Sequence, residues 1–433
     1  MPSEIEERVL QRVKPDKGTM NKVNRAVKAL ENELRSRSHG KFRVLSVGSI
    51  PKGTYLEDPD IDMFILFPRD TPFHELTEVG LRVGREVLDD PVEKYAEHPY
   101  IHGRYMGFQA DIVPCFEVSE GEPLGSSVDR TPLHTSYVIS NLEEGQRDQV
   151  ILLKAFMKGI GVYGAENRTM GFSGYLCELL VLRYGSFRSV VEAASGWTLG
   201  EDVDQGDFDD PLVLIDPVDP GRNVASALSA HNFHLFVHAS SCFLRDPGMK
   251  FFFPEDSSMD EHHMIDAISS RGTLFVDVVI PAPDIVDDNL YPQVYKAERA
   301  LRDSLERDGF VLMHTKSLVA YGMVHVLFEI AYGLLPGIEK HRGPPVGNPH
   351  TRQFQEKHGD GVYLEDGRLM VDRPRTVRTS EMALFASVPS LDLGTDLNHI
   401  FRRDMRILKG DDILEKYPEV MKEFLKRGFP WNR

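Results

Sequence analysis

An uninterrupted apolar run, Met63–Phe67, directly follows two closely spaced aspartates, Asp60 and Asp62, and this feature constrains the fold most. A run this apolar is typical of a central strand that is buried on both faces of a sheet. Residues two apart on a strand point to the same face, so we expect the two carboxylates to lie side by side. Close carboxylates repel each other unless a cation lies between them. The pattern therefore predicts a metal site held by a rigid strand, although Asp-x-Asp after Pro59 also suits an ordinary turn.

Two further features join this pair of acids. Asp111 interrupts the strand-like run "FQADIVPC", and an acid buried there without a partner would be costly. Gly48-Ser49 ends an earlier strand-like run, where glycine lets the backbone approach a ligand and the serine hydroxyl can hold a phosphate. Mg²⁺ prefers such carboxylate oxygens. Three acids and a phosphate-binding turn together predict nucleotidyl transfer with two Mg²⁺ ions.

The order of the expected elements predicts a multidomain α+β protein. The 433 residues are too many for one compact core. Helices and a small mixed sheet are expected at the N-terminus, apolar residues at helical spacing follow, and the last third mixes strands with long helices. We expect a catalytic domain at 1–138, a mainly helical domain at 139–255, and an α+β region at 256–433 with an insertion at roughly 305–380.

Local signals predict several details of these elements. A break at residues 15–18 divides residues 4–37 into two helices, and Thr71 is the expected N-cap of a helix over 73–88. His134 follows Pro132 in an expected loop, and the Gly/Pro-rich residues 341–350 are expected to form an exposed loop. Glu365-Asp366-Gly367 is expected to be a hairpin turn.

Charge and cysteine content limit the functional class. The net charge of −17 argues against a nucleic-acid binder, unless the basic residues are concentrated locally, as they are at 372–378 and 399–410. The three cysteines lie far apart, which favours a reducing compartment without zinc or disulfides. The N-terminus has no apolar core of the signal-peptide kind, and no apolar stretch is long enough for a membrane span. We therefore expect a cytoplasmic protein with no membrane partner.

Several sequence blocks in fixed order resemble a known family. They are "YAEHPYIHG", "ADIVPCF", "VDRTPLH", "YGAENRTMGFSGYLCELL", "DPVDPGRNVA" and "PDIVDDNLYPQ". With the Gly-Ser and Asp-x-Asp pattern, they are similar to the archaeal, class I CCA-adding enzymes, which are tRNA nucleotidyltransferases with a polymerase β-like catalytic domain. The blocks span most of residues 45–300, and the resemblance is fainter beyond about 305.

The resemblance implies an activity and its partners. Such enzymes add C, C and A to the tRNA 3′ end from CTP and ATP without a nucleic-acid template. It implies Mg²⁺ as the cofactor, contacts to the acceptor stem and TΨC arm, a helical central domain that completes the nucleotide pocket, and a C-terminal RNA-binding region. It also allows a homodimer.

Carried over by position, the resemblance assigns roles to individual residues. The implied metal ligands and catalytic residues are Asp60, Asp62 and Asp111. The implied nucleotide-binding residues are Gly48, Ser49, Lys52, His134, Lys154, Tyr163 and Arg222, with Arg222 reading the base. The residues themselves leave alternatives open: Lys154 at the surface, His134 without a role, Tyr163 in the core, and Arg222 paired with Asp216 or Asp219.

The resemblance also has departures. Glu57-Asp58 stands where a more basic turn is expected, and Asp60 stands where relatives often have Glu. Because the net charge is negative, we expect a locally basic tRNA-binding face, built from Arg299, Arg402, Arg403, Arg406 and the 372–378 segment.

Two other functions are weighed against CCA addition. One is a poly(A) polymerase-like or small-molecule nucleotidyltransferase, which the blocks after residue 128 disfavour. The other is a catalytically inactive RNA-binding protein, against which the three retained carboxylates argue.

Overall fold

The computed structural model describes residues 3–57, 59–95, 98–119, 121–122, 125–126, 128–255 and 259–432. The chain forms two compact units. The N-terminal unit comprises Met1–Ser257 and Gly428–Arg433, and the inserted unit comprises Ser258–Arg427. Within the described ranges, none of the helices combines the length and the hydropathy of a membrane span. The earlier division at 138 and 255 stays a prediction.

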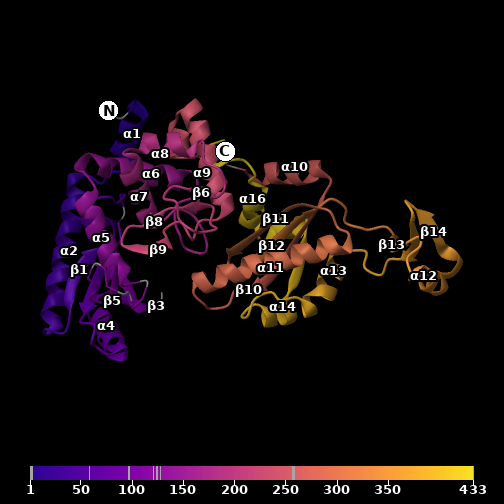
Figure 1. The fold of residues 1–433 in the computed structure, drawn as a ribbon, viewed down its shortest axis with the longest axis horizontal. Helices are drawn as coiled ribbons and strands as arrows, with labels where there is room; N and C mark the ends of the chain where they lie inside the picture. Colours follow the sequence, from indigo (N-terminus) through magenta and orange to yellow (C-terminus); the bar gives the residue numbers. More distant parts are fainter. Residues whose placement is uncertain are drawn as a thin grey trace. The chain divides into compact units, whose positions relative to one another are not determined.

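A five-stranded sheet, in the order β1-β2-β5-β4-β3, organises the first half of the N-terminal unit (Figure 1). Its strands are β1 (Arg43–Val47), β2 (Ile61–Phe67), β3 (Asp89–Tyr95), β4 (Pro99–Tyr105) and β5 (Phe108–Phe116). The central strands β2 and β5 are parallel, and the other neighbours are antiparallel. In β2 every residue except Asp62 is buried, as its apolar sequence predicts.

Helices cover this sheet and position its edge. One face packs against α2 (Lys17–Ser38) and α4 (Phe73–Val87), whose buried side chains share a core with Met63 and Ile65 of β2. Two other helices contact each other near β1: the short α3 (Ser49–Lys52) and α5 (Arg130–Asn141). The acidic end of β2 is thus held between well-packed elements.

A second core in the same unit is mainly helical and rich in phenylalanine. It is built from α1 (Glu4–Val13), α6 (Glu144–Gly159), α7 (Gly174–Tyr184), α8 (Phe187–Ala194) and α9 (Ala230–Arg245). Short strands β6 (Glu201–Asp202), β7 (Leu212–Val213), β8 (Ile215–Asp216) and β9 (Asp219–Asn223) follow α8. The last residues return to this core: Trp431, in η4 (Pro430–Asn432), stacks on Phe251 of η1 (Met249–Phe251) with ring centroids 5.3 Å apart.

The inserted unit contains an antiparallel sheet in the order β11-β12-β10-β16. Its strands are β10 (Leu274–Pro281), β11 (Leu312–Ala320), β12 (Met323–Ile330) and β16 (Arg406–Lys409). One face packs against α11 (Asp287–Asp308), α13 (Ser380–Ser387) and α14 (Asn398–Asp404). The other face packs against α10 (Glu261–Arg271), α15 (Asp411–Lys416) and α16 (Pro418–Leu425).

A smaller three-stranded sheet, in the order β13-β15-β14, follows in the same unit. It consists of β13 (Ile338–Pro345), β14 (Val362–Glu365) and β15 (Arg368–Pro374), with α12 (Thr351–His358), η2 (Gly359–Gly361) and η3 (Val388–Ser390) nearby in sequence. The predicted hairpin is confirmed, because Glu365 pairs with Arg368 around Asp366-Gly367.

Three local predictions are wrong. Residues 341–345 belong to β13 and not to a loop; the strand accommodates its prolines at the sheet's edge, where the register shifts between Arg342 and Pro345. His134 lies on α5, because Pro132 falls in the first turn of the helix, where no backbone donor is needed. The N-cap of α4 is Pro72 rather than Thr71. The predicted helix pair over 4–37 is confirmed by α1 and α2.

Candidate active site

The three predicted carboxylates gather at one end of the two parallel strands. Asp62 on β2 stands in direct register with Asp111 on β5, and Asp60 directly precedes β2. Asp60 is thus not on the strand, as the sequence pattern suggested, but it stays next to its partner because the strand begins at Ile61. Burial, followed by the charges of Asp111 and Asp60, raises the pKa of Asp62 to about 7. Burial and the charge of Asp111 also raise the pKa of Asp60.

These acids have the donor chemistry of a divalent-cation site. Among the described residues, no group of three potential ligands already has metal-binding geometry. The imidazole Nδ1 of His102, on β4, lies 2.6 Å from Oδ1 of Asp111 and orients that carboxylate. Closely spaced carboxylate oxygens suit a hard cation such as Mg²⁺, and its positive charge would offset the burial and the mutual repulsion that raise the pKa values of Asp60 and Asp62. Sequence reasoning missed His102, although it lies within the quoted block "YAEHPYIHG".

Gly48 allows the turn before Ser49 to approach the carboxylates. Its φ is 76°, and a Cβ atom placed on it would lie 2.0 Å from Oδ2 of Asp62. Any larger residue would collide with that carboxylate and would also adopt a strained backbone conformation. Ser49, the first residue of α3, follows Gly48 directly, and it lines the same cavity as Asp62.

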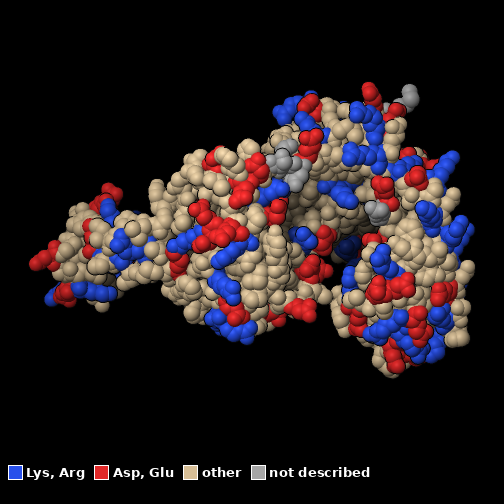
Figure 2. Space-filling view, turned by 180° about the vertical axis from the view of Figure 1, so that it is seen from behind, with Lys and Arg blue, Asp and Glu red and all other residues tan. Residues whose placement is uncertain are grey.

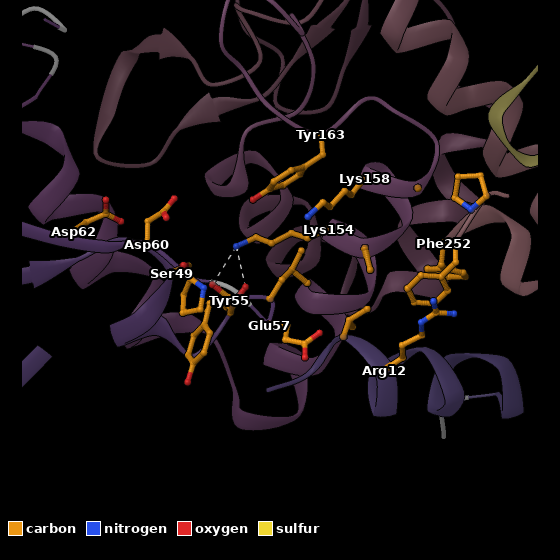
Figure 3. Close-up of a pocket in the computed structure, with 18 residues that line it drawn as sticks. Arg12, Ser49, Tyr55, Glu57, Asp60, Asp62, Lys154, Lys158, Tyr163 and Phe252 are labelled. Atoms are coloured by element: carbon orange, nitrogen blue, oxygen red, sulfur yellow. Dashed lines mark hydrogen bonds between the residues drawn. The ribbon is translucent and has the colours of Figure 1, made fainter. Parts of the chain in front are cut away.

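A cavity of about 720 Å³ extends from the carboxylates (Figure 3). Ser49, Asp60 and Asp62 lie at one end, and Lys154 and Tyr163 line its middle. Lys158 lies beside Lys154, and Arg12 and Phe252 are at the other end. Glu57 also lines the cavity, whereas Asp58 lies outside the described residues. The volume of the cavity falls in the range of sites that bind small molecules.

A buried glutamate, Glu178 on α7, holds both predicted phosphate-binding lysines. Its carboxylate lies 2.8 Å from Nζ of Lys52 and 3.3 Å from Nζ of Lys154, and it accepts a 2.6 Å hydrogen bond from Thr54. Lys154 also donates to the backbone oxygen of Thr54 at 3.1 Å. Burial alone would raise the pKa of Glu178, but the two lysines lower it overall. Sequence reasoning missed Glu178, although a lone acid in the apolar helix "YLCELLVL" is a usable signal.

His134 and Arg222 belong to a second polar cluster, centred on Asp216. Oδ2 of Asp216 lies 2.8 Å from His134 Nε2 and 2.9 Å from Arg222 Nη1. The pairing of Arg222 with Asp216 is one of the alternatives that the sequence left open. His134 stacks on Tyr175, with ring centroids 3.9 Å apart, and Lys52 lies 5.6 Å from that ring. The cluster therefore adjoins Lys52. Asp216, His134 and Arg222 do not line the cavity.

The two pKa directions in this cluster fit an ionised Asp216 paired with Arg222, with a neutral His134 hydrogen-bonded to the same carboxylate. Burial lowers the pKa of His134, although Asp216 opposes the shift. Burial alone would raise the pKa of Asp216, but His134 and Arg222 lower it overall.

In the cavity, burial raises the pKa of Tyr163, so its hydroxyl stays protonated at neutral pH and can donate to a ligand.

The predicted RNA-binding arginines all lie in the inserted unit. Arg299 is exposed on α11, Arg402 and Arg403 are exposed on α14, and Arg406 is exposed on β16. Arg403 pairs with Asp404 at 2.8 Å. On the face shown in Figure 2, basic and acidic side chains are interspersed among the described residues.

The basic 372–378 segment is largely occupied by contacts within the unit. Arg373 and Arg375 both pair with Glu339, at 2.6 and 3.4 Å, and Arg378 donates to the backbone oxygen of Leu335. Its arginines are thus less available to a phosphate backbone than their sequence suggests.

Comparisons with known proteins cover nearly the whole chain. Residues 27–134 match the nucleotidyltransferase domain, residues 148–253 the second domain of tRNA nucleotidyltransferase, and residues 271–410 the C-terminal domain of the CCA-adding enzyme. Among solved structures, the Cid1 poly(U) polymerase aligns with a TM-score of 0.46 and 15% identity, over 58% of this chain and 98% of that chain.

Curated relatives are similar over the full length. The CCA-adding enzyme of Methanosarcina barkeri is 36% identical over 95% of each chain. That of Halobacterium salinarum is 38% identical over 94% of each chain, and that of Thermoplasma volcanium is 37% identical over 97% of each. With its nucleotidyltransferase domain and these relatives, the chain belongs to the family of the archaeal CCA-adding enzymes.

Proposed function

We propose that this protein adds C, C and A to the 3′ end of tRNA, with CTP and ATP as substrates and pyrophosphate as the second product. The full-length similarity to CCA-adding enzymes carries the proposal. The register of Asp62 with Asp111, beside Asp60 and Ser49, supports it chemically, because these residues supply the oxygen ligands that nucleotidyl transfer requires.

The reaction is a displacement at the α-phosphorus of the nucleotide. The 3′ hydroxyl oxygen of the RNA forms a bond to this phosphorus, and its proton passes to solvent. The bond from the phosphorus to the α,β-bridging oxygen breaks, and pyrophosphate leaves with the electron pair. Asp60, Asp62 and Asp111 would hold divalent ions, Mg²⁺ in our proposal, and bound ions supply positive charge at the reacting phosphate and at the leaving group.

The other predicted nucleotide-binding residues, which lie in the cavity or in the polar cluster beside it, bind and orient the nucleotide in this proposal. Ser49, beside Asp62, would contact the phosphates with its hydroxyl, and Tyr163 would donate its protonated hydroxyl. Lys52 and Lys154 would contribute positive charge while Glu178 keeps them in place. Arg222, oriented by Asp216, would read the base, and His134 would support it from the same carboxylate.

The proposal also assigns partners and regions. Residues 1–138 would carry the chemistry, 139–255 would complete the nucleotide pocket, and 256–433 would hold the acceptor stem and TΨC arm. We also propose that the protein is a cytoplasmic homodimer. Light scattering of the purified protein would measure its oligomeric state.

Poly(A) tailing is the alternative within the superfamily, and nucleotide choice separates it from CCA addition. A tRNA that lacks its three terminal residues is incubated with ATP alone, and product lengths are read on a sequencing gel. We expect no extended tail, because A is added only after two C residues. A long run of A residues would instead support the tailing activity.

The proposed tRNA face predicts a salt-dependent affinity. Each phosphate contact contributes about 0.7–0.9 to the slope of log K against log salt concentration, so Arg402→Ala should flatten this slope by roughly that amount. Filter binding between low and moderate salt measures it. Arg188→Ala, which removes a partly exposed arginine paired with Glu192 in the N-terminal unit, serves as the control. Affinity of the unmodified protein that does not change with salt would contradict the electrostatic account.

A further inference from the structure

A row of basic side chains without acids runs along the first half of α2. Residues 17–30 contain four bases and no acid, in a chain whose net charge is −17. All four bases, which we call the α2 row, are exposed: Lys17, Lys22, Arg25 and Lys28. Because an α-helix has 3.6 residues per turn, Lys17, Arg25 and Lys28 lie within an arc of about 80°, with Lys22 beside them. The opposite side of α2 is apolar and packs into the core against the sheet.

The bases at the C-terminal end of the same helix have acidic partners. Arg35 pairs with Glu31 one turn earlier, and Arg37 Nη2 lies 3.0 Å from Oε1 of Glu33. Among the residues that the structure describes, by contrast, the side chains of the α2 row form no hydrogen bond or ion pair. One helix thus neutralises its last bases and leaves its first ones without a counter-ion.

The stability of the helix does not explain the α2 row. Arg25 lies three residues from both Lys22 and Lys28, and like charges at this spacing on a helix repel each other. Lys17 lies in the first turn, which contains no acid, and a positive charge there opposes the helix dipole. An anionic partner would offset both effects, so binding accounts for a row that weakens its own helix.

The geometry of the α2 row indicates which kind of anion it fits. The row extends over about 16 Å from Lys17 to Lys28, whereas a single phosphate is held by donors that converge on it. Exposed Asn21 and Asn24 lie between the bases, and asparagine amides contact phosphate and sugar oxygens. All residues of α2 are described, and none is an exposed large apolar side chain of the kind that a membrane-surface helix inserts into lipid. A linear polyanion with hydrophilic contacts therefore fits best.

We propose that the α2 row binds the phosphate backbone of an RNA duplex. Duplex RNA presents a regular line of phosphates and, in its wide minor groove, 2′-hydroxyl groups that the asparagine amides can contact without reading the sequence. Among the described residues that line the cavity, none belongs to α2. The inference therefore goes beyond the proposed function, because the row holds RNA at a place other than the 3′ end that receives nucleotides.

Fluorescence anisotropy of a labelled, blunt RNA duplex of about 16 base pairs tests the α2 row. The full chain is compared with the triple variant Lys22→Gln, Arg25→Gln, Lys28→Gln and with Arg25→Lys. Each lost phosphate contact removes about 0.7–0.9 from the slope of log K against log salt concentration, so the triple variant should flatten this slope by about 2–3. Its affinity at moderate salt should fall by roughly tenfold or more, and Arg25→Lys should keep most of the affinity.

Arg35→Gln is the matched control for the charge removed. Arg35 is an exposed arginine of the same helix, but it already pairs with Glu31, so its loss should leave affinity and salt slope nearly unchanged. In every variant, kcat and KM for CTP and ATP should equal those of the unmodified protein, because α2 contributes no residue to the described cavity lining. The melting temperature of the triple variant should not fall, since like-charge repulsion is removed.

The other outcomes separate RNA from different partners. Unchanged affinity and slope in the triple variant, or equally strong binding of a DNA duplex of the same sequence, would overturn the inference. If duplex affinity is unchanged and the row instead governs binding to phosphatidylserine vesicles, the partner is a membrane. If it instead governs the oligomeric state in light scattering, the partner is a second copy, through its acidic residues 192–219. Row-dependent duplex binding by a protein that incorporates no nucleotide would contradict the proposed function and support this inference.

Discussion

Replacing Asp62 by asparagine is expected to reduce nucleotide incorporation into tRNA by about a thousandfold or more. Asp62 stands in register with Asp111 and beside Asp60, so its loss removes the central carboxylate of the proposed metal site. Metal-ion stabilisation of a transition state contributes several kcal/mol, and each 1.4 kcal/mol corresponds to a factor of about ten in rate. Single-turnover incorporation of labelled CTP measures the effect. Activity close to that of the unmodified protein would contradict the assignment of the metal site.

Unfolding measurements provide the control that Asp62→Asn is folded. Burial and the neighbouring acids raise the pKa of Asp62 to about 7 in the folded state, above its value in the unfolded chain. The stability associated with the protonated form is therefore present below the unfolded pKa, near 4, and is lost as pH rises through about 7. Without divalent ions, the asparagine variant should thus be more stable than the unmodified protein at pH 8.5 by ~1–2 kcal/mol, and this difference should shrink at low pH. A variant that is less stable at pH 8.5 would show that its inactivity reflects misfolding.

Replacing Glu178 by glutamine is expected to destabilise the protein by about 3–5 kcal/mol, because two buried ammonium groups lose their shared counter-ion. Lys52 and Lys154 are both almost fully buried, and each lies within 3.3 Å of this carboxylate. Equilibrium unfolding in urea measures the change. Incorporation should also fall, because the lysines would no longer be held beside the cavity.

Glu192→Gln is the matched control for Glu178→Gln. Glu192 is an exposed helical glutamate that pairs with Arg188 at 3.2 Å, and surface pairs contribute only about 0–1 kcal/mol. If both variants lose the same small amount of stability, then Glu178 is not the structural counter-ion that its position indicates.

The carboxylate site could be anticipated from the sequence because its signals are local. An apolar run predicts β2, and its burial on both faces holds Asp62 in place. Asp111 interrupts a second apolar strand, and the parallel pairing of β2 with β5 brings it beside Asp62. The family resemblance added the nucleotide-binding residues, whose individual roles stay predictions.

Other parts of the site depend on contacts between distant segments. Glu178 meets Lys52 across 126 positions of sequence, and His134 meets Asp216 across 82, so no local pattern reveals either pair. The sequence does not distinguish Lys158 from an ordinary surface lysine, and only the structure shows that it lines the cavity. The loop predicted at His134, which follows Pro132, is a helix in the structure, because proline is tolerated in the first turn of a helix.

Incorporation of labelled CTP and ATP into 3′-truncated tRNA, with Mg²⁺ or with a chelator, tests the central claim most directly. With Mg²⁺, the proposed activity requires that CTP alone extends the tRNA by two C residues, and that CTP with ATP adds one further A and then stops. With the chelator, no nucleotide should be added. Extension that continues past the single A, or that proceeds equally well without divalent ions, would contradict the account.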